Sequence, residues 1–76
     1  MSQRTDTGVL KRERIRKIHV MLQGAGDVEL SRFIATIEYQ MGLTPIKVRE
    51  YLGVLERLNL VEVDEAANTV REVKPV

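Results

Sequence analysis

The sequence predicts an α+β fold, in which three helices and a short extended segment are followed by a C-terminal β-hairpin. Apolar residues recur at helical spacing in three segments, and two short segments near the end of the chain alternate between apolar and polar residues. The 76 residues suffice for one domain with a small core. Because only 4% of the residues are aromatic, leucine, isoleucine, valine and methionine must build that core.

The first helix is expected over residues 9–23. Residues 1–8 show no periodicity and are expected to form a flexible N-terminal arm, so that residues 9–76 make up the domain. Glycines 24 and 26 end the helical pattern. The apolar residues at helical spacing are Ile15, Ile18 and Leu22.

A short extended segment and a second helix follow. Residues 28–30 are too few for more than a single β-bridge or an extended connector. Ser31 is the expected N-cap of a helix that runs to Met41, and Gly42 can end it in the left-handed conformation. The apolar residues of this helix are Phe33, Ile34, Ile37 and Met41.

The third helix has the clearest boundaries. Thr44 can cap its first turn, and Pro45 at the first helical position gives up only an amide that has no helical partner. The helix is expected to run to Leu58, with Asn59 as a left-handed terminator. Its predicted inner face consists of Val48, Tyr51, Leu52, Leu55 and Leu58.

The chain closes with the predicted hairpin. Residues 60–64 and 69–73 have strand patterns, and residues 65–68 read as the turn between them. The second and third helices must cross steeply, because a helix cannot continue through the Gly-Leu-Thr-Pro segment at residues 42–45.

The segment GLTPIKVREYLGVLERLNLVEV, residues 42–63, resembles the winged helix-turn-helix family, and the resemblance extends over residues 11–73. The family often has glycine where this chain has Asn59, and asparagine tolerates the same backbone geometry. The resemblance implies that the third helix is a recognition helix and the hairpin a wing. It also implies a DNA-binding transcriptional regulator, although winged helices serve as protein-binding modules too.

The outer face of the third helix supplies the candidate base-reading residues. Arg49 could bind guanine through two hydrogen bonds, Lys47 could hold a phosphate, and Ile46 could contact a thymine methyl group. Alternatively, the basic residues are simply solvated or paired with Glu50 and Glu56. Gly53 costs roughly 1 kcal/mol in a helix interior, which suggests a close approach by DNA or a partner there. The candidates are Pro45, Ile46, Lys47, Arg49, Glu50, Gly53 and Arg57.

The net charge of +1 conceals an asymmetry. Residues 1–23 carry six basic and two acidic side chains, whereas residues 24–76 carry six basic and nine acidic ones. The basic end suits a nucleic-acid backbone, although a solvated helix face accounts for it equally well. The candidate phosphate contacts are Arg4, Lys11, Arg12 and Arg14.

The predicted wing does not favour DNA. A wing that lies on phosphates is usually basic, but this one carries Glu62, Asp64, Glu65 and Glu72 against Arg71 and Lys74. The alternative function is therefore a protein–protein interaction module. Such a module would bind through the acidic wing or through Ile46 and Val54 on the third helix.

Several function classes are excluded by composition. The chain has no cysteine and one histidine, His19, so neither a metal site nor a cofactor is expected. No residue pattern indicates catalysis, and we do not expect an enzyme. No apolar segment is long enough to span a membrane, which leads us to expect a cytoplasmic protein. Useful specificity for double-stranded DNA would call for a homodimer or a protein partner.

Overall fold

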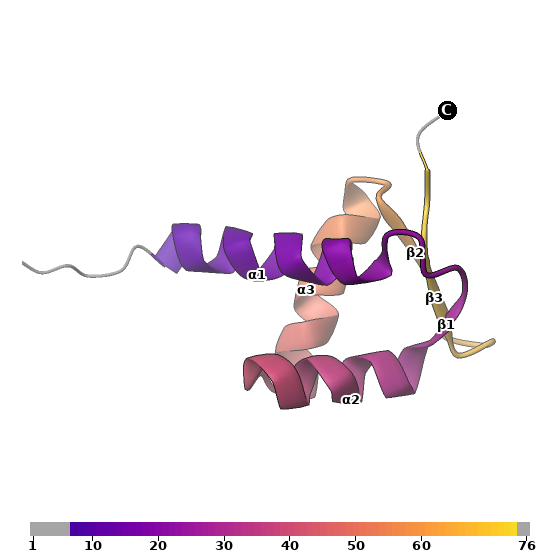
Figure 1. Ribbon diagram of the computed structural model, residues 1–76, viewed down its shortest axis with the longest axis horizontal. Helices are drawn as coiled ribbons and strands as arrows, with labels where there is room; N and C mark the ends of the chain where they lie inside the picture. The colour runs from indigo at the N-terminus through magenta and orange to yellow at the C-terminus, as the bar shows by residue number, and fades with distance from the viewer. Residues whose placement is uncertain (1–6, 75–76) are drawn as a thin grey trace, which may run out of the picture.

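The computed structural model describes residues 7–74, which form three helices and a three-stranded antiparallel sheet (Figure 1). The predicted α+β class is confirmed, and the layout is compatible with that of a winged helix. No helix in residues 7–74 has the length and apolar character needed to cross a membrane. In chain order the elements are α1 (Thr7–Leu22), β1 (Val28–Glu29), α2 (Leu30–Met41), α3 (Pro45–Arg57), β2 (Val61–Asp64) and β3 (Thr69–Glu72).

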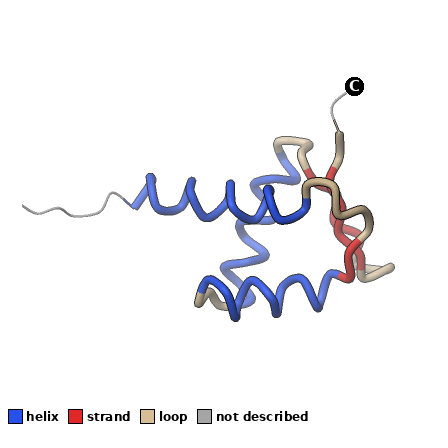
Figure 2. Tube along the Cα trace, viewed as in Figure 1, coloured by secondary structure: helices blue, strands red, loops and turns tan. Residues whose placement is uncertain are grey.

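The helices gather on one side of the molecule and the strands on the other (Figure 2). Helix α3 packs against both α1 and α2, and it also contacts β2. One aliphatic core joins these elements, with Tyr51 and Phe33 as its only buried aromatic side chains. Burying such side chains is the main source of stability for a domain of this size. The core residues are Ile18, Leu22, Leu30, Phe33, Ile34, Ile37, Val48, Tyr51, Leu52, Leu55, Val61 and Val70.

The junction between α2 and α3 follows the predicted chemistry. Gly42 has a φ of 66°, and its N–H donates to the carbonyl oxygen of Glu38, which closes α2. Thr44 caps α3, because its hydroxyl oxygen accepts a hydrogen bond of 3.2 Å from the amide of Lys47. Pro45 occupies the first helical turn as expected. The residues that change the direction of the chain between α2 and α3 therefore all lie within residues 42–45.

The end of α3 is also closed locally. Asn59 is left-handed with a φ of 62°, as predicted. The Leu60 amide donates to the carbonyl oxygen of Leu55. This is the hydrogen bond of a Schellman motif, and it satisfies a carbonyl group that has no partner within the helix. Leu58 was predicted to be in the core, but it is 60% exposed. The chain reverses at Asn59, so Leu60 packs against the core and Leu58 faces solvent.

The sheet is larger than the predicted hairpin. Strand β3 lies in the middle, between β2 and β1, and the turn at residues 65–68 joins β2 to β3. The expected bridge at residues 28–30 is instead a two-residue strand, with Val28 opposite Val70 and Glu29 opposite Thr69. Strand β1 thus covers the edge of β3 that a lone hairpin would leave open.

The start of α2 differs from the prediction. Ser31 is not the N-cap, because the helix already begins at Leu30 and its N-cap position, Glu29, makes no side-chain cap. Asn68 of the β2–β3 turn supplies the missing acceptors: its backbone oxygen binds the Leu30 amide at 2.8 Å, and its Oδ1 binds the Ser31 amide at 3.0 Å. The wing therefore caps a helix that lies far from it in sequence.

Helix α1 begins earlier than predicted. Thr7 and Gly8 are helical, although both fall within the predicted arm. A glycine in the first helical turn is tolerated, because that turn contributes few intrahelical N–H bonds. Residues 1–6 of the predicted arm lie outside the described residues. In Figure 1 the N-terminal part of α1 extends past the body formed by α2 and α3.

Candidate nucleic-acid interface

The outer face of α3 is open to solvent at its N-terminal half. Ile46 is 79% exposed, although it is a large apolar residue. Val48, Tyr51, Leu52 and Leu55 turn inward and are buried, which confirms the predicted inner face at these four positions. The predicted site residues that are exposed on α3 are Pro45, Ile46, Lys47, Arg49, Glu50 and Arg57.

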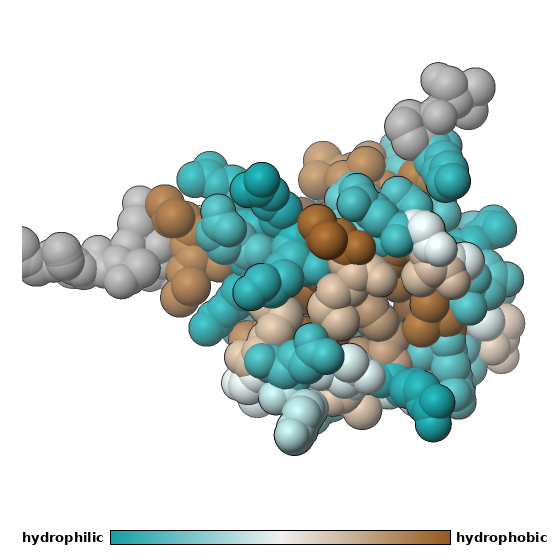
Figure 3. Space-filling model, in the orientation of Figure 1, coloured by the Kyte–Doolittle hydropathy of each residue, from teal (hydrophilic) through white to brown (hydrophobic). Residues whose placement is uncertain are grey.

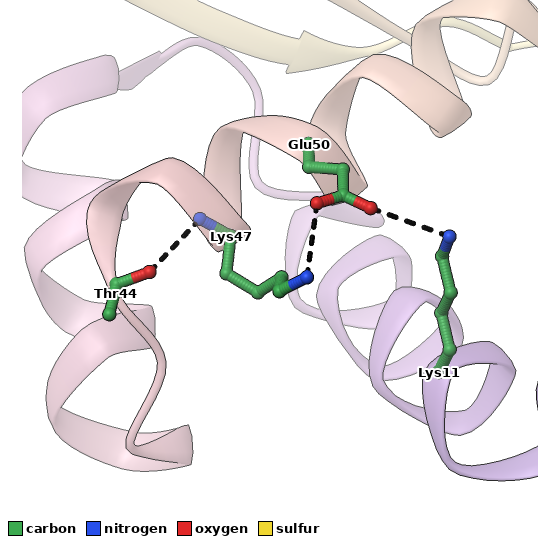
Figure 4. A network of polar contacts seen from close by, with 4 residues as sticks. All are labelled: Lys11, Thr44, Lys47 and Glu50. Atoms are coloured by element: carbon green, nitrogen blue, oxygen red, sulfur yellow. Dashed lines mark hydrogen bonds and ion pairs between the residues drawn. The ribbon is translucent and has the colours of Figure 1, made fainter. Parts of the chain in front are cut away.

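Two lysines converge on one carboxylate at this face (Figure 4). Lys47 Nζ lies 3.2 Å from Glu50 Oε1, and Lys11 Nζ of α1 lies 3.4 Å from Glu50 Oε2. Thr44 fixes the backbone of the same turn through the Lys47 amide. The network places Lys11 beside α3, so α1 and α3 contribute basic side chains to one surface.

The electrostatic state of Glu50 follows from this network. The hydrogen bond and positive charge of Lys47, followed by those of Lys11, hold the pKa of Glu50 below its ordinary value of 4.5. Glu50 is thus ionised at neutral pH and offsets part of the positive charge of both lysines. The alternative that Glu50 pairs with neighbouring bases is correct, whereas Glu56 makes no ion pair with any residue in 7–74.

Arg49 is held by the wing. Its Nη1 donates to Glu65 Oε2 at 2.5 Å, and the two side chains are 50% and 65% exposed. Glu65 is the first residue of the β2–β3 turn and is absent from the predicted site residues. Nothing in the local sequence connects it with Arg49, 16 residues earlier, apart from the opposite charge.

The basic residues of α1 divide between two surfaces. Lys11 lies at the α3 face, whereas Arg14 lines a shallow hollow with Lys17, Gln40 and Met41, between α1 and the end of α2. The structure therefore does not group Arg14 with α3. Arg12 is exposed and forms no ion pair within residues 7–74. Arg4 lies outside the described residues.

Much of the front surface along α1 is hydrophilic (Figure 3). Hydrophobic atoms appear at its N-terminal end in the same view. Val9 and Leu10, near the start of α1, are 43% and 40% exposed. Lys17 was not predicted as a site residue, but like Arg12 and Arg14 it has no ion-pair partner in the part of the chain that is described. Helix α1 thus carries positive charge that the fold does not neutralise.

The acidic side chains of the wing are engaged by other groups of the protein. Glu62 pairs with Arg71 across the two strands, and this raises the pKa of Arg71 above its ordinary value. Asp64 Oδ1 accepts from the Ala67 amide within the turn at 3.0 Å. Each of the four carboxylates accepts a hydrogen bond within the protein. Glu62 accepts from Arg71, Asp64 from the Ala67 amide, Glu65 from Arg49, and Glu72 from the Gly24 amide.

Gly53 lies at a small hollow between α3 and the wing, which Leu52, Val63 and Glu65 also line. A Cβ atom added at Gly53 would meet only Arg57 Nη1, at 3.7 Å, an ordinary van der Waals distance. The described fold therefore does not require glycine at this position. Val54, the other apolar candidate for a protein contact, is half-buried.

Residues 7–74 contain no cluster of three or more histidine, aspartate or glutamate side chains that could hold a metal ion. His19 is partly buried on α1. Comparisons with protein-family models, with curated proteins and with solved structures gave no match. The support for the candidate interface is therefore structural. It consists of an exposed face of α3, with α1 on one side and the β2–β3 turn on the other.

Proposed function

We propose that this protein binds double-stranded DNA and acts as a transcriptional regulator of the winged helix-turn-helix type. The observation that carries the proposal is the exposure of the N-terminal half of α3, with Ile46, Lys47 and Arg49 all facing solvent. A helix presented in this way, at the edge of a helix-turn-helix pair, fits the width of the major groove.

Each exposed side chain has a defined role in the proposed complex. Arg49 has the planar fork that matches the O6 and N7 acceptors of guanine. Lys47 is suited to a phosphate oxygen, and Ile46 to the methyl group of thymine. Lys11 and Arg12 extend the positive surface along α1 toward the DNA backbone, since Lys11 already lies beside α3.

The free protein binds DNA weakly in this proposal, because its own carboxylates compensate part of the positive charge. Glu50 and Glu65 occupy Lys11, Lys47 and Arg49 before DNA arrives. Few base contacts come from a single small domain, so we propose that a second copy or a protein partner supplies the remaining specificity. We also propose that the protein is cytoplasmic.

Salt dependence of binding to random duplex DNA tests the proposal. Neutralising several phosphates releases counterions, so the logarithm of the association constant should fall steeply as the logarithm of salt concentration rises. Replacing Arg49 and Lys47 together by alanine should weaken binding, and the loss of the Lys47 phosphate contact should reduce the slope by roughly one. The matched control replaces Arg32 and Lys74 by alanine, which removes the same charge outside the α3 face. Equal effects of the two pairs, or no binding at low salt, would overturn the proposal.

A second candidate function is the binding of a basic protein. The outer face of the sheet carries Asp27, Glu62 and Asp64 around a shallow hollow, with Arg71 as the only base lining it. Arg71 is already engaged by Glu62, so the surface is acidic. Replacing Asp27 and Asp64 by asparagine would weaken binding to such a partner and leave DNA binding unchanged or slightly stronger, which separates the two candidates.

A further inference from the structure

The ion pair between Arg49 and Glu65 joins the candidate recognition helix to the wing turn. Arg49 Nη1 on α3 lies 2.5 Å from Oε2 of Glu65, the first residue after β2. The pair lies at the rim of the small hollow that Leu52, Gly53 and Val63 line. In this arrangement the guanidinium group of Arg49 binds a carboxylate of the protein itself.

The turn that carries Glu65 is fixed at both ends. Asp64 Oδ1 accepts from the Ala67 amide, and Asn68 is tied to the start of α2 through Leu30 and Ser31. Because the backbone of Glu65 is held in place, forming the ion pair orders side chains and not the turn itself. Exposed ion pairs contribute little when both partners must be ordered, and a fixed turn lowers that cost for this pair.

We propose that Glu65 competes with DNA for Arg49 and thereby lowers the affinity of the α3 face for nucleic acid. The inference rests on the DNA-binding function proposed above and assigns a regulatory role within the same site. While Arg49 Nη1 donates to Glu65, the guanidinium cannot offer its two Nη groups together to guanine, and the carboxylate offsets the positive charge that a phosphate would meet. Since both side chains are half-exposed or more, DNA can displace the carboxylate, and the pair reduces binding without abolishing it.

A second ion pair of the wing provides a control for the Arg49–Glu65 pair. Glu62 and Arg71 form a cross-strand ion pair with similar exposure, 55% and 56%, on the outer face of the sheet. Changing Glu62→Gln removes the same charge from the same hairpin but frees no base on α3. The comparison of E65Q with E62Q therefore separates release of Arg49 from a general gain in positive charge.

The experiment measures the affinity of E65Q, E62Q and the unchanged protein for a random duplex by fluorescence anisotropy at low salt. Removing a competing exposed pair is expected to tighten binding about fivefold for E65Q. The matched E62Q protein should stay within about twofold of the unchanged protein. In an Arg49→Ala background, E65Q should lose its advantage, because its effect acts through Arg49.

Three results would overturn the inference. E65Q could bind no more tightly than E62Q, it could bind more weakly than the unchanged protein, or its gain could persist in the Arg49→Ala background. In each case the unchanged protein still binds DNA, and the proposed function stands. If instead none of the proteins binds DNA at low salt, the proposed function fails, and the inference fails with it.

Discussion

The β2–β3 turn contacts two helices from its two ends, and the two contacts differ in kind. At one end, Asn68 presents neutral hydrogen-bond acceptors to the unpaired amides at the start of α2. At the other end, Glu65 presents a charge to Arg49 on the exposed face of α3. The first contact is partly sheltered, whereas the second is open to solvent and ions.

The two contacts, within four residues of each other, are expected to act on different properties of the protein. A helix-terminal amide has no partner inside its own helix, so an acceptor there stabilises the folded state. An exposed ion pair is screened by salt and stabilises the fold little, but this one offsets the positive charge of Arg49, which the proposed function assigns to DNA. We therefore expect changes at Asn68 to affect unfolding and changes at Glu65 to affect binding.

The largest effect is expected for Asn68→Ala. The substitution removes the acceptor for the Ser31 amide and places alanine at a φ of 56°, which together should destabilise the protein by about 2 kcal/mol. Urea unfolding followed by circular dichroism measures the loss. Asn68→Gly tolerates the backbone conformation and isolates the side-chain contribution. A loss at Asn68→Ala of no more than about 0.5 kcal/mol, as for an ordinary surface substitution, would contradict the capping role.

A smaller loss is expected for Thr44→Ala at the other capped helix. Only one side-chain hydrogen bond is removed, and the backbone conformation suits alanine, so the expected cost is about 1 kcal/mol. Thr44→Ser retains the hydroxyl group and should recover most of this stability in the same unfolding measurement. If Thr44→Ala proved more costly than Asn68→Ala, the local cap would outweigh the remote one, and our ranking would be wrong.

A gain in stability is expected for Gly53→Ala, because Gly53 lies within α3. It lines the same hollow as Glu65. The added methyl group fits at normal distance from Arg57, and alanine is favoured over glycine in a helix by roughly 0.5–1 kcal/mol. Thermal unfolding should show a higher melting temperature. DNA affinity measured on the same variant tells whether DNA approaches this backbone closely: unchanged affinity excludes such an approach, and a large loss would indicate it.

The smallest effect concerns the pH dependence of Glu50. Its pKa is lowered in the folded protein, so its pairing stabilises the fold above the ordinary pKa of 4.5 and is lost as pH falls through the folded value. Carboxyl carbon shifts in an NMR titration should show Glu50 titrating below 4.5. Lys47→Met should raise this pKa more than Lys11→Met does, because Lys47 contributes more. Titration of Glu50 at 4.5 in the unchanged protein would contradict the network.

Most of the fold could be predicted because its signals are local. Thr44, Gly42 and Asn59 act on amides or carbonyls within a few residues of themselves, and all three have their predicted roles. The prediction of Ser31 as the N-cap was wrong, because the residue that caps α2, Asn68, lies 37 residues away in sequence. Asn68 is brought to α2 by the sheet and not by the local sequence. Strand β1 was underestimated for the same reason, since its partner is β3.

The candidate site could be predicted only in part. Helical periodicity correctly identified most residues of α3 that face outward, because the buried stripe determines the opposite face; Gly53 was also expected there but is only partly exposed. The pairing of these residues could not be predicted fully: Lys47 and Glu50 lie within one helix, whereas Lys11 and Glu65 arrive from other elements. Leu58 was misplaced because periodicity does not show where the chain leaves the helix.

The most direct test of the central proposal is a titration of isotope-labelled protein with duplex DNA, followed by amide chemical shifts. We predict that the largest changes occur at residues 45–53 of α3 and at Lys11 and Arg12 of α1, and that they diminish as salt is added. Changes confined to the outer face of the sheet, or no change at low salt, would contradict DNA recognition by α3.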